Sequence, residues 1–175
     1  MKPLINIADA AQTRALANGD CFEVMMAPLA ELVGGKKLGA NVTTVPPGKA
    51  AFPLHHHYAN EEHFFILRGT GVLRFGGATY PVKPGDYIVA PSGGPEHAHQ
   101  LINTGSEDLA YLGISTLISP EVVGYPDTGK TGVAVVPFGA SGPARFLVAA
   151  SDREKTGYWD GEDGAAVRAL TGSQP

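Results

Sequence analysis

From Gly39 onward the sequence alternates between short β-rich runs and clusters of turn-forming residues, and this alternation restricts the fold more than any other feature. Seven runs are each followed by a cluster that contains Gly, Pro, Asn or Ser, and they cover residues 41–45, 63–67, 71–75, 78–82, 87–90, 97–102 and 109–116. No segment with the 3.6-residue helical period lies between them, which disfavours a parallel sheet with crossover helices. Evenly spaced short strands predict an all-β sandwich or barrel.

The two ends of the chain differ from this middle part. Residues 8–17 are predicted to form a short helix that stops at Asn18-Gly19, and residues 21–26 are a strand candidate. Two more strands are predicted at 133–137 and 144–149. We therefore expect one domain with an N-terminal arm (1–24), a barrel (25–150) and an irregular C-terminal tail (151–175).

Composition supports a turn-rich domain and limits its partners. The 175 residues include 23 glycines and 14 prolines, well above ordinary usage, which fits many hairpins. The 13 Lys and Arg are scattered and are outnumbered by 17 Asp and Glu, so we expect neither nucleic acid nor anionic membrane as a partner. Apolar runs are too short to cross a bilayer, and Asp9 interrupts any leader-like stretch. We expect a cytoplasmic location.

The histidines form two groups that resemble a metal site. Residues i and i+2 of a strand share a face, so His55 and His57 point the same way and His56 points the opposite way. A strand that returns beside them would bring one carboxylate of Glu61-Glu62 next to the two imidazoles. Glu62 is the better candidate, because the apolar residues at 64 and 66 would then share its face.

A third imidazole comes from the strand predicted at 97–102, where His97 and His99 would share a face. Three imidazoles and one carboxylate suit Zn, Mn, Fe, Ni or Cu, with positions left open for water or substrate. His97 either replaces His99 as a ligand or assists it from behind. The alternative for a single histidine is a hydrogen-bonded structural side chain, and we assign that role to His56 and His63.

Two motifs resemble those of the cupin superfamily. The first spans 48–69 and the second 85–103, and their matching residues are Gly48, His55, His57, Glu62 and Gly69, then Gly85, Pro91, Gly93, His99 and Asn103. Two spacings depart from the pattern, one residue longer before His55 and three longer before His99. The wider sequence is similar to small single-domain bacterial cupins. The resemblance implies a double-stranded β-helix, or jelly roll, with a divalent transition metal in the barrel mouth held by His55, His57, Glu62 and His99.

The resemblance also implies a range of activities, because cupins include dioxygenases, decarboxylases and isomerases. We expect a metal-dependent enzyme that acts on a small oxygen-bearing substrate. The alternatives are a non-catalytic binding or sensor protein that captures a ligand with the metal, and a barrel that has lost its metal. The residues do not identify a general base, although Tyr87, Tyr111 and Arg74 are available. Besides its small-molecule ligand, we expect a second copy of the chain as partner, paired through the strand at 21–26 to form a homodimer.

Overall fold

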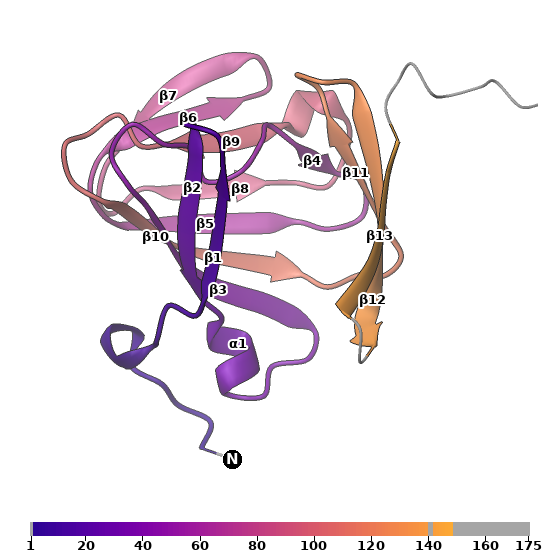
Figure 1. Cartoon of the computed structure of the whole chain (residues 1–175), viewed down its shortest axis with the longest axis horizontal. Helices are drawn as coiled ribbons and strands as arrows, with labels where there is room; N and C mark the ends of the chain where they lie inside the picture. The colour runs from indigo at the N-terminus through magenta and orange to yellow at the C-terminus, as the bar shows by residue number, and fades with distance from the viewer. Residues whose placement is uncertain (1, 140–141, 149–175) are drawn as a thin grey trace, which may run out of the picture.

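The computed structural model describes residues 2–139 and 142–148, and β-strands make up most of this part of the chain (Figure 1). The strands are β1 (Arg14–Asn18), β2 (Phe22–Ala27), β3 (Leu38–Val45), β4 (His56–His57), β5 (Glu62–Arg68), β6 (Gly71–Phe75), β7 (Ala78–Val82), β8 (Tyr87–Ala90), β9 (His99–Ile102), β10 (Leu109–Thr116), β11 (Glu121–Tyr125), β12 (Lys130–Gly139) and β13 (Gly142–Val148). The helical pieces are the short helix α1 (Leu29–Leu32) and the 3₁₀ turns η1 (Ile7–Asp9) and η2 (Pro95–His97).

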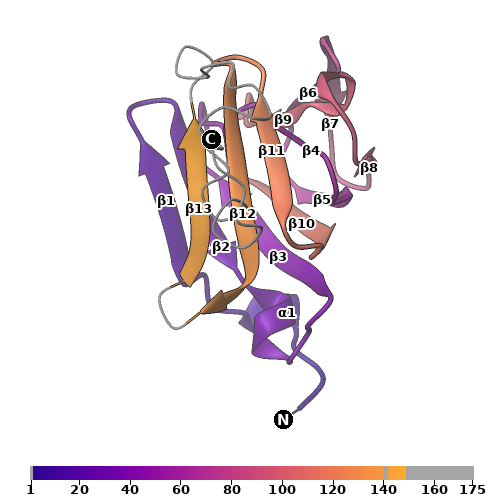
Figure 2. The ribbon, with the colours of Figure 1, turned by 90° about the vertical axis from the view of Figure 1, so that its right-hand side faces the viewer.

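The strands form two layers. One is a six-stranded sheet in the order β1-β2-β3-β10-β5-β8. The other contains the sheets β7-β6-β9 and β4-β11-β12-β13, which are joined by the bridge between His55 and His99. Figure 2 shows β11, β12 and β13 side by side in front of the six-stranded sheet. All strand pairs inside the sheets are antiparallel, and hairpins connect neighbours such as β6 and β7.

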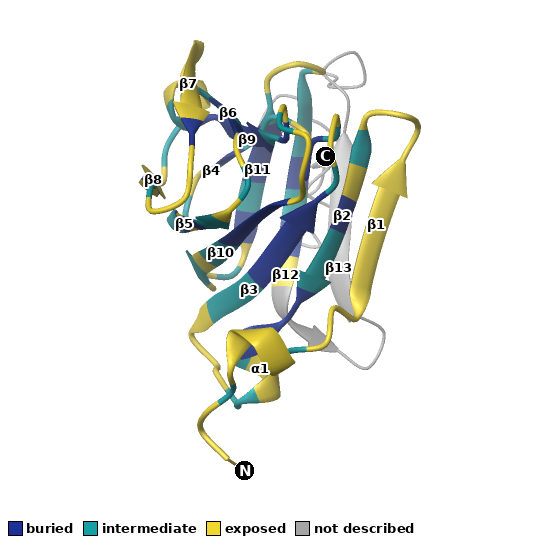
Figure 3. Cartoon of the chain, turned by 90° about the vertical axis from the view of Figure 1, so that its left-hand side faces the viewer, coloured by how far each residue is buried: buried dark blue, intermediate teal, exposed yellow. Residues whose placement is uncertain are grey.

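The hydrophobic core lies between the layers. In Figure 3 the second half of β3 and the first residues of β10 are buried, whereas β1 is exposed along its whole length. The main cluster of buried apolar side chains comes from both layers and includes Val24, Val45, Ile66, Leu73, Leu101 and Leu109. This arrangement is an all-β jelly-roll sandwich, which confirms the predicted fold class.

The turn residues of the two motifs occupy the places that the sequence predicts. Gly48, Gly69, Gly85 and Gly93 all have positive φ, a backbone conformation that other residues rarely adopt. At Gly69, with φ of 74°, an added Cβ would lie 2.3 Å from the Asp108 carbonyl oxygen, so two separate constraints require glycine. The predicted strands at 71–75, 78–82, 87–90 and 109–116 coincide with β6, β7, β8 and β10.

Two predictions about the N-terminal part are wrong. Residues 8–17 do not form a helix: they contain the end of η1 and most of β1, which pairs with β2 along its whole length. Pairing with a neighbouring strand outweighs the local helix propensity of the alanines there. The strand predicted at 21–26 corresponds to β2, but it lies between β1 and β3 inside the sheet. Both edges of β2 are occupied within the chain, so the pairing route through this strand is wrong, while the homodimer itself stays a prediction.

The structure does not test the predicted boundaries between arm, barrel and tail. The division at residues 24 and 150 stays a prediction, and the tail at 151–175 lies outside the described residues. Within the described part of the chain, no helix has the length and apolarity needed to cross a membrane.

Candidate metal centre

The first two imidazoles belong to a short segment at one end of the barrel. His55 pairs with His99 through backbone hydrogen bonds, and His57 lies opposite Val123 of β11. Because successive side chains of an extended segment point to opposite faces, His55 and His57 both line the same cavity, as the sequence predicts. The side chain of His56 points away and its Nδ1 lies 2.8 Å from the Gly93 carbonyl oxygen.

The carboxylate arrives from the other layer. Glu62 begins β5 on the inner face of the six-stranded sheet, in line with Phe64 and Ile66, so the choice of Glu62 for this face is correct. The predicted route is wrong, however. The histidine segment does not form a hairpin with β5, because β4 pairs with β11 whereas β5 pairs with β10 and β8.

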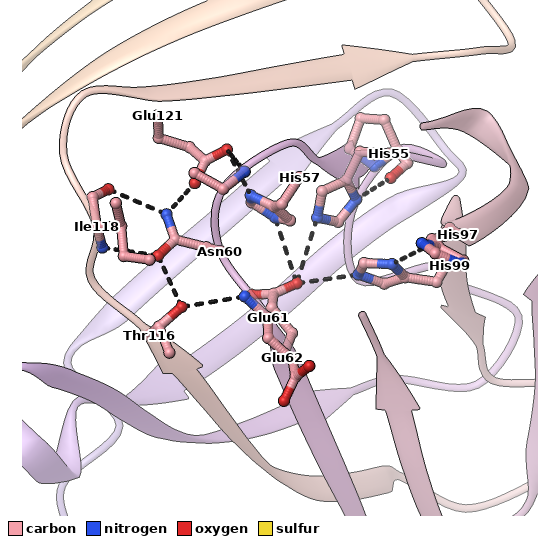
Figure 4. A network of polar contacts seen from close by, with 12 residues as sticks. His55, His57, Asn60, Glu61, Glu62, His97, His99, Thr116, Ile118 and Glu121 are labelled. Carbon is pink, nitrogen blue, oxygen red and sulfur yellow. Dashed lines mark hydrogen bonds and ion pairs between the residues drawn. The ribbon is translucent and has the colours of Figure 1, made fainter. Parts of the chain in front are cut away.

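Three imidazole nitrogens surround a single oxygen of Glu62 (Figure 4). The Glu62 Oε2 atom lies 2.9 Å from Nε2 of His99, 3.3 Å from Nε2 of His57 and 3.7 Å from Nε2 of His55. One ligand atom each from His55, Glu62 and His99 lies within 4.8 Å of the other two. The structure thus brings together all four side chains that the sequence nominated.

These separations match those of atoms that share one ion. Donor atoms bound at about 2.1 Å lie about 3.0 Å apart as octahedral neighbours and about 3.4 Å apart in a tetrahedron. The mean of the three distances from Glu62 Oε2 to the imidazole nitrogens lies within the range of about 3.0–3.4 Å that these two geometries give. His55, Glu62 and His99 therefore fit a divalent transition metal in both chemistry and spacing, and His57 lies close enough to Glu62 to add a fourth donor to the set.

The protonation pattern of the imidazoles supports a cation between them. Nδ1 of His55 lies 2.8 Å from the Pro53 carbonyl oxygen, and Nδ1 of His99 lies 3.1 Å from the His97 carbonyl oxygen. A carbonyl oxygen can only accept, so each Nδ1 donates its proton there, and Nε2 is the nitrogen that faces Glu62. Nε2 of His99 lies 2.9 Å from Glu62 Oε2, within hydrogen-bond distance, and because the carboxylate only accepts, that contact needs a proton on Nε2 when no metal is bound. A metal ion would take the place of that proton, and carbonyl-anchored imidazoles are typical of metal ligands.

The electrostatics of the site place His55 and Glu62 in the protonation states that metal ligands need. Burial lowers the pKa of His55 more strongly than the neighbouring Glu62 raises it, so the His55 ring is neutral near pH 7. Burial acts to raise the pKa of Glu62, but the contacts with the three imidazoles outweigh it and hold the pKa well below the usual value. A neutral imidazole and an ionised carboxylate are the forms that bind metals.

The structure places His97 outside this cluster. His97 ends the 3₁₀ turn η2 instead of lying on a strand with His99, and its own Nδ1 lies 3.1 Å from the Ser92 carbonyl oxygen. Its contribution is the backbone carbonyl that orients His99. His63 points out of the barrel, where its ring lies between the Glu61 carboxylate and the Tyr87 hydroxyl.

One acidic residue near the site was missed by the sequence analysis. Glu121 is only 4% exposed, and its Oε1 lies 3.8 Å from Nδ1 of His57, on the side of the ring away from Glu62 (Figure 4). The amide of Asn60 donates to Glu121 Oε2, and the backbone N–H of Ala59 donates to Oε1 at 3.3 Å. In the sequence, only the alternating pattern of residues 121–125 after a proline could have pointed to Glu121, and that pattern indicates the strand β11 and not a role for the carboxylate.

A cavity of about 560 Å³ opens beside the four side chains. Of the three groups considered as a base, only Tyr111 lines it, because Tyr87 is on the outer face and Arg74 is paired with Asp127. Burial and then the charge of Glu62 raise the pKa of Tyr111, so its phenol stays protonated. Tyr111 can donate a hydrogen bond to a ligand but does not act as a base.

Comparisons with known proteins identify the family and the fold. The cupin-domain family matches residues 41–115. The oxalate-binding protein of Thermotoga maritima is 36% identical over 74 residues, which is 42% of this chain and 58% of that protein, so the match spans well under two thirds of the relative.

Two solved structures share the fold. A predicted oxalate decarboxylase from Thermotoga maritima is 30% identical, with a TM-score of 0.56, over 66% of this chain and 99% of that one. A sugar phosphate isomerase from Silicibacter pomeroyi is 21% identical, with a TM-score of 0.72, over 88% and 97% of the two chains, and at that identity it supports the fold alone. By sequence, by fold and by the position of its motifs, this chain belongs to the cupin family.

Proposed function

We propose that His55, His57, His99 and Glu62 bind a divalent transition metal and that the protein is a metal-dependent enzyme acting on a small oxygen-bearing substrate. The supporting observation is the convergence of three Nε2 atoms on Glu62 Oε2 at 2.9–3.7 Å, with two of the rings anchored through Nδ1 to backbone carbonyls. A bound divalent ion would supply Lewis-acid chemistry, polarising the oxygen groups of a chelating substrate.

The other residues of the cavity have roles that fit such a substrate. Phe64 packs beneath His99, with ring centroids 5.5 Å apart, and limits access of water to the ligands from the core side. The protonated phenol of Tyr111 is available to donate a hydrogen bond to a substrate oxygen. Decarboxylation, oxygenation and isomerisation all act on substrates with adjacent oxygen groups, and the predicted oxalate decarboxylase from Thermotoga maritima illustrates one of them by its name.

A second candidate function is binding without turnover. The relative with 36% identity is an oxalate-binding protein, which favours capture of a small dicarboxylate at the same four side chains. No described residue of the cavity provides a base beyond the nominated ligands, as Tyr111 is protonated. This alternative keeps the metal but assigns it only to ligand capture.

Metal binding is tested first and by itself. Tag-free protein, dialysed against each of Zn²⁺, Mn²⁺, Fe²⁺, Ni²⁺ and Cu²⁺, should retain about one ion per chain for at least one of them by elemental analysis. Glu62→Gln keeps the size of the side chain but removes the charge, and it should retain much less. Equal metal retention by wild type and Glu62→Gln would contradict the proposed site.

Turnover then separates the two functions. Metal-loaded protein is incubated with oxalate, 2-oxo acids and hydroxyketones, and product formation is followed by chromatography. Turnover that stops with a chelator and returns with metal supports the enzyme. Metal-dependent binding of a compound with no turnover across the panel supports the binding protein, and turnover that survives complete metal removal excludes the proposed mechanism.

A further inference from the structure

A lysine at the cavity wall has no part in the metal site described above. Lys130 begins β12, is half-buried and lines the same cavity as the four candidate ligands. In the described part of the chain its ammonium makes no ion pair, and it lies 5.6 Å from the centre of the Tyr125 ring. Three other cations of the described barrel have carboxylate partners: Arg74 pairs with Asp127 at 2.8 Å, Lys83 with Asp86 at 3.0 Å and Arg68 with Asp108 at 3.5 Å.

The position of Lys130 relative to the metal site is set by aromatic contacts. The Tyr125 ring lies over His55, with ring centroids 6.2 Å apart and an interplanar angle of 27°. Lys130, Tyr125 and His55 therefore form a continuous row along one wall. The ammonium is separated from the candidate ligands by one aromatic ring, a spacing that a short carbon chain can cover.

Charge in the cavity favours an anion that reaches both ends of this row. Among the described lining residues, Glu62 is the only Asp or Glu and Lys130 is the only Lys or Arg. A divalent ion with one carboxylate and neutral imidazoles would leave a net positive charge at the metal end. Lys130 adds a second positive charge at the wall, and no described lining carboxylate other than Glu62 offsets it.

The volume also indicates a ligand longer than oxalate. About 560 Å³ is typical of pockets that hold molecules of ten or more heavy atoms. The wall between the two charged ends is mainly apolar, with Phe52, Val123 and Tyr125 among its residues. Such a wall suits a hydrocarbon chain between two polar groups.

We propose that the cavity binds an organic diacid, with one end chelating the metal and the distal carboxylate bound by Lys130. This inference rests on the proposed function, because it needs a metal at His55, His57, His99 and Glu62. A single ammonium beside an apolar wall suits a carboxylate better than a phosphate, for which proteins usually gather several donors.

The test uses matched pairs of acids that differ only in the distal group. Protein loaded with Zn²⁺, which has no redox chemistry, is titrated by calorimetry with 2-oxoglutarate, 2-oxoadipate and 2-oxopimelate. Each titration is repeated with the 2-oxo monoacid of the same length. Both members of a pair chelate identically, so the ratio of their affinities measures the distal carboxylate alone. At least one length should favour the diacid by on the order of 10- to 100-fold, the range for a charge-assisted hydrogen bond.

Two variants assign that preference to Lys130. Lys130→Met keeps the length and the apolar stem, and should reduce the diacid affinity to that of the monoacid while monoacid binding and Zn²⁺ affinity stay unchanged. Lys130→Arg should keep most of the preference. Lys37→Met, at an exposed position that does not line the cavity, removes the same charge and should behave as wild type.

The outcomes separate this inference from the function on which it rests. Equal binding of diacid and monoacid at every length, or a preference that persists in Lys130→Met, overturns the diacid inference and leaves the metal site intact. Failure to bind Zn²⁺ overturns both, whereas Zn²⁺ binding with no affinity for any of these acids overturns the diacid inference alone. A length-dependent preference that only the Lys130→Met variant loses supports the proposal.

Discussion

Glu121 offers the sharpest test of how the metal site is supported, because it contacts a candidate ligand without being one. Glu121→Gln keeps the shape of the side chain but removes its charge, 3.8 Å from Nδ1 of His57. Two unit charges at about 4 Å interact by about 4 kcal/mol at the effective dielectric constant of 20 that suits protein sites. A metal-bound imidazole carries only a fraction of a charge, so we expect a loss of about 1–2 kcal/mol in metal binding, or roughly tenfold in affinity.

The same substitution should destabilise the metal-free protein for a different reason. Both oxygens of Glu121 accept hydrogen bonds, from Asn60 and from the backbone of Ala59. A glutamine amide provides only one acceptor, so in either orientation one N–H group faces another. Leaving a buried donor unsatisfied costs about 1–3 kcal/mol.

The assay separates the two effects. Metal affinity is measured by competition with a chromophoric chelator, and the free energy of unfolding by urea titration of the metal-free protein. Asn103→Ala is the matched control, since buried Asn103 donates to the carbonyls of Val45 and Glu107 and lies away from the metal ligands. It should lower stability with little change in metal affinity. If Glu121→Gln binds metal within about twofold of wild type, or if Asn103→Ala loses as much affinity, the reasoning is wrong.

Three further predictions test the site by other routes. Free metal at 100 times its Kd should stabilise the fold by about 2.7 kcal/mol and raise the thermal midpoint by roughly 5–10 °C; calorimetry that shows no shift, or a shift that a chelator does not reverse, argues against a native metal site. His99→Ala should weaken metal binding by at least about 100-fold, whereas His97→Ala should change it by less than about threefold, because only the backbone of His97 contacts the site; the reverse order would make His97 the ligand. The unfolded chain binds protons at His55 and Glu62 more readily than the folded one, whose pKa values are lowered, so urea unfolding should show stability falling as pH drops below about 6.5 and again below about 4.5; stability that rises on acidification through this range would contradict the assigned shifts.

The local parts of this architecture were predictable from the sequence. Glycines at turns and strands with two-residue alternation can be recognised directly in the amino-acid sequence. For this reason β6, β7, β8 and β10 match the predicted ranges. The choice of Glu62 over Glu61 followed from the same alternation, since Phe64 and Ile66 lie on its face. A strand sets these features within a few residues, so one sequence suffices to find them.

Contacts between distant segments were not predictable in the same way. The pairing of β4 with β11 joins residues more than sixty positions apart, and nothing near His57 indicates that Glu121 lies behind it. Lys130 was overlooked for the same reason, because the strand that bears it reaches the cavity only through the sheet order. Periodicity shows which face a residue occupies but not which strand will face it.

The distribution of the four candidate ligands over both layers has a consequence for the lifetime of the folded state. His55, His57 and His99 belong to one layer and Glu62 to the other, so an ion among them would act as a tie between the two sheets. Such a tie forms only after both layers have assembled, and its free energy should therefore appear almost entirely in slower unfolding, with refolding unchanged. In a metal-poor environment the chain would fold at the same rate but unfold faster. Resistance to proteolysis would then report how much metal is available to the protein.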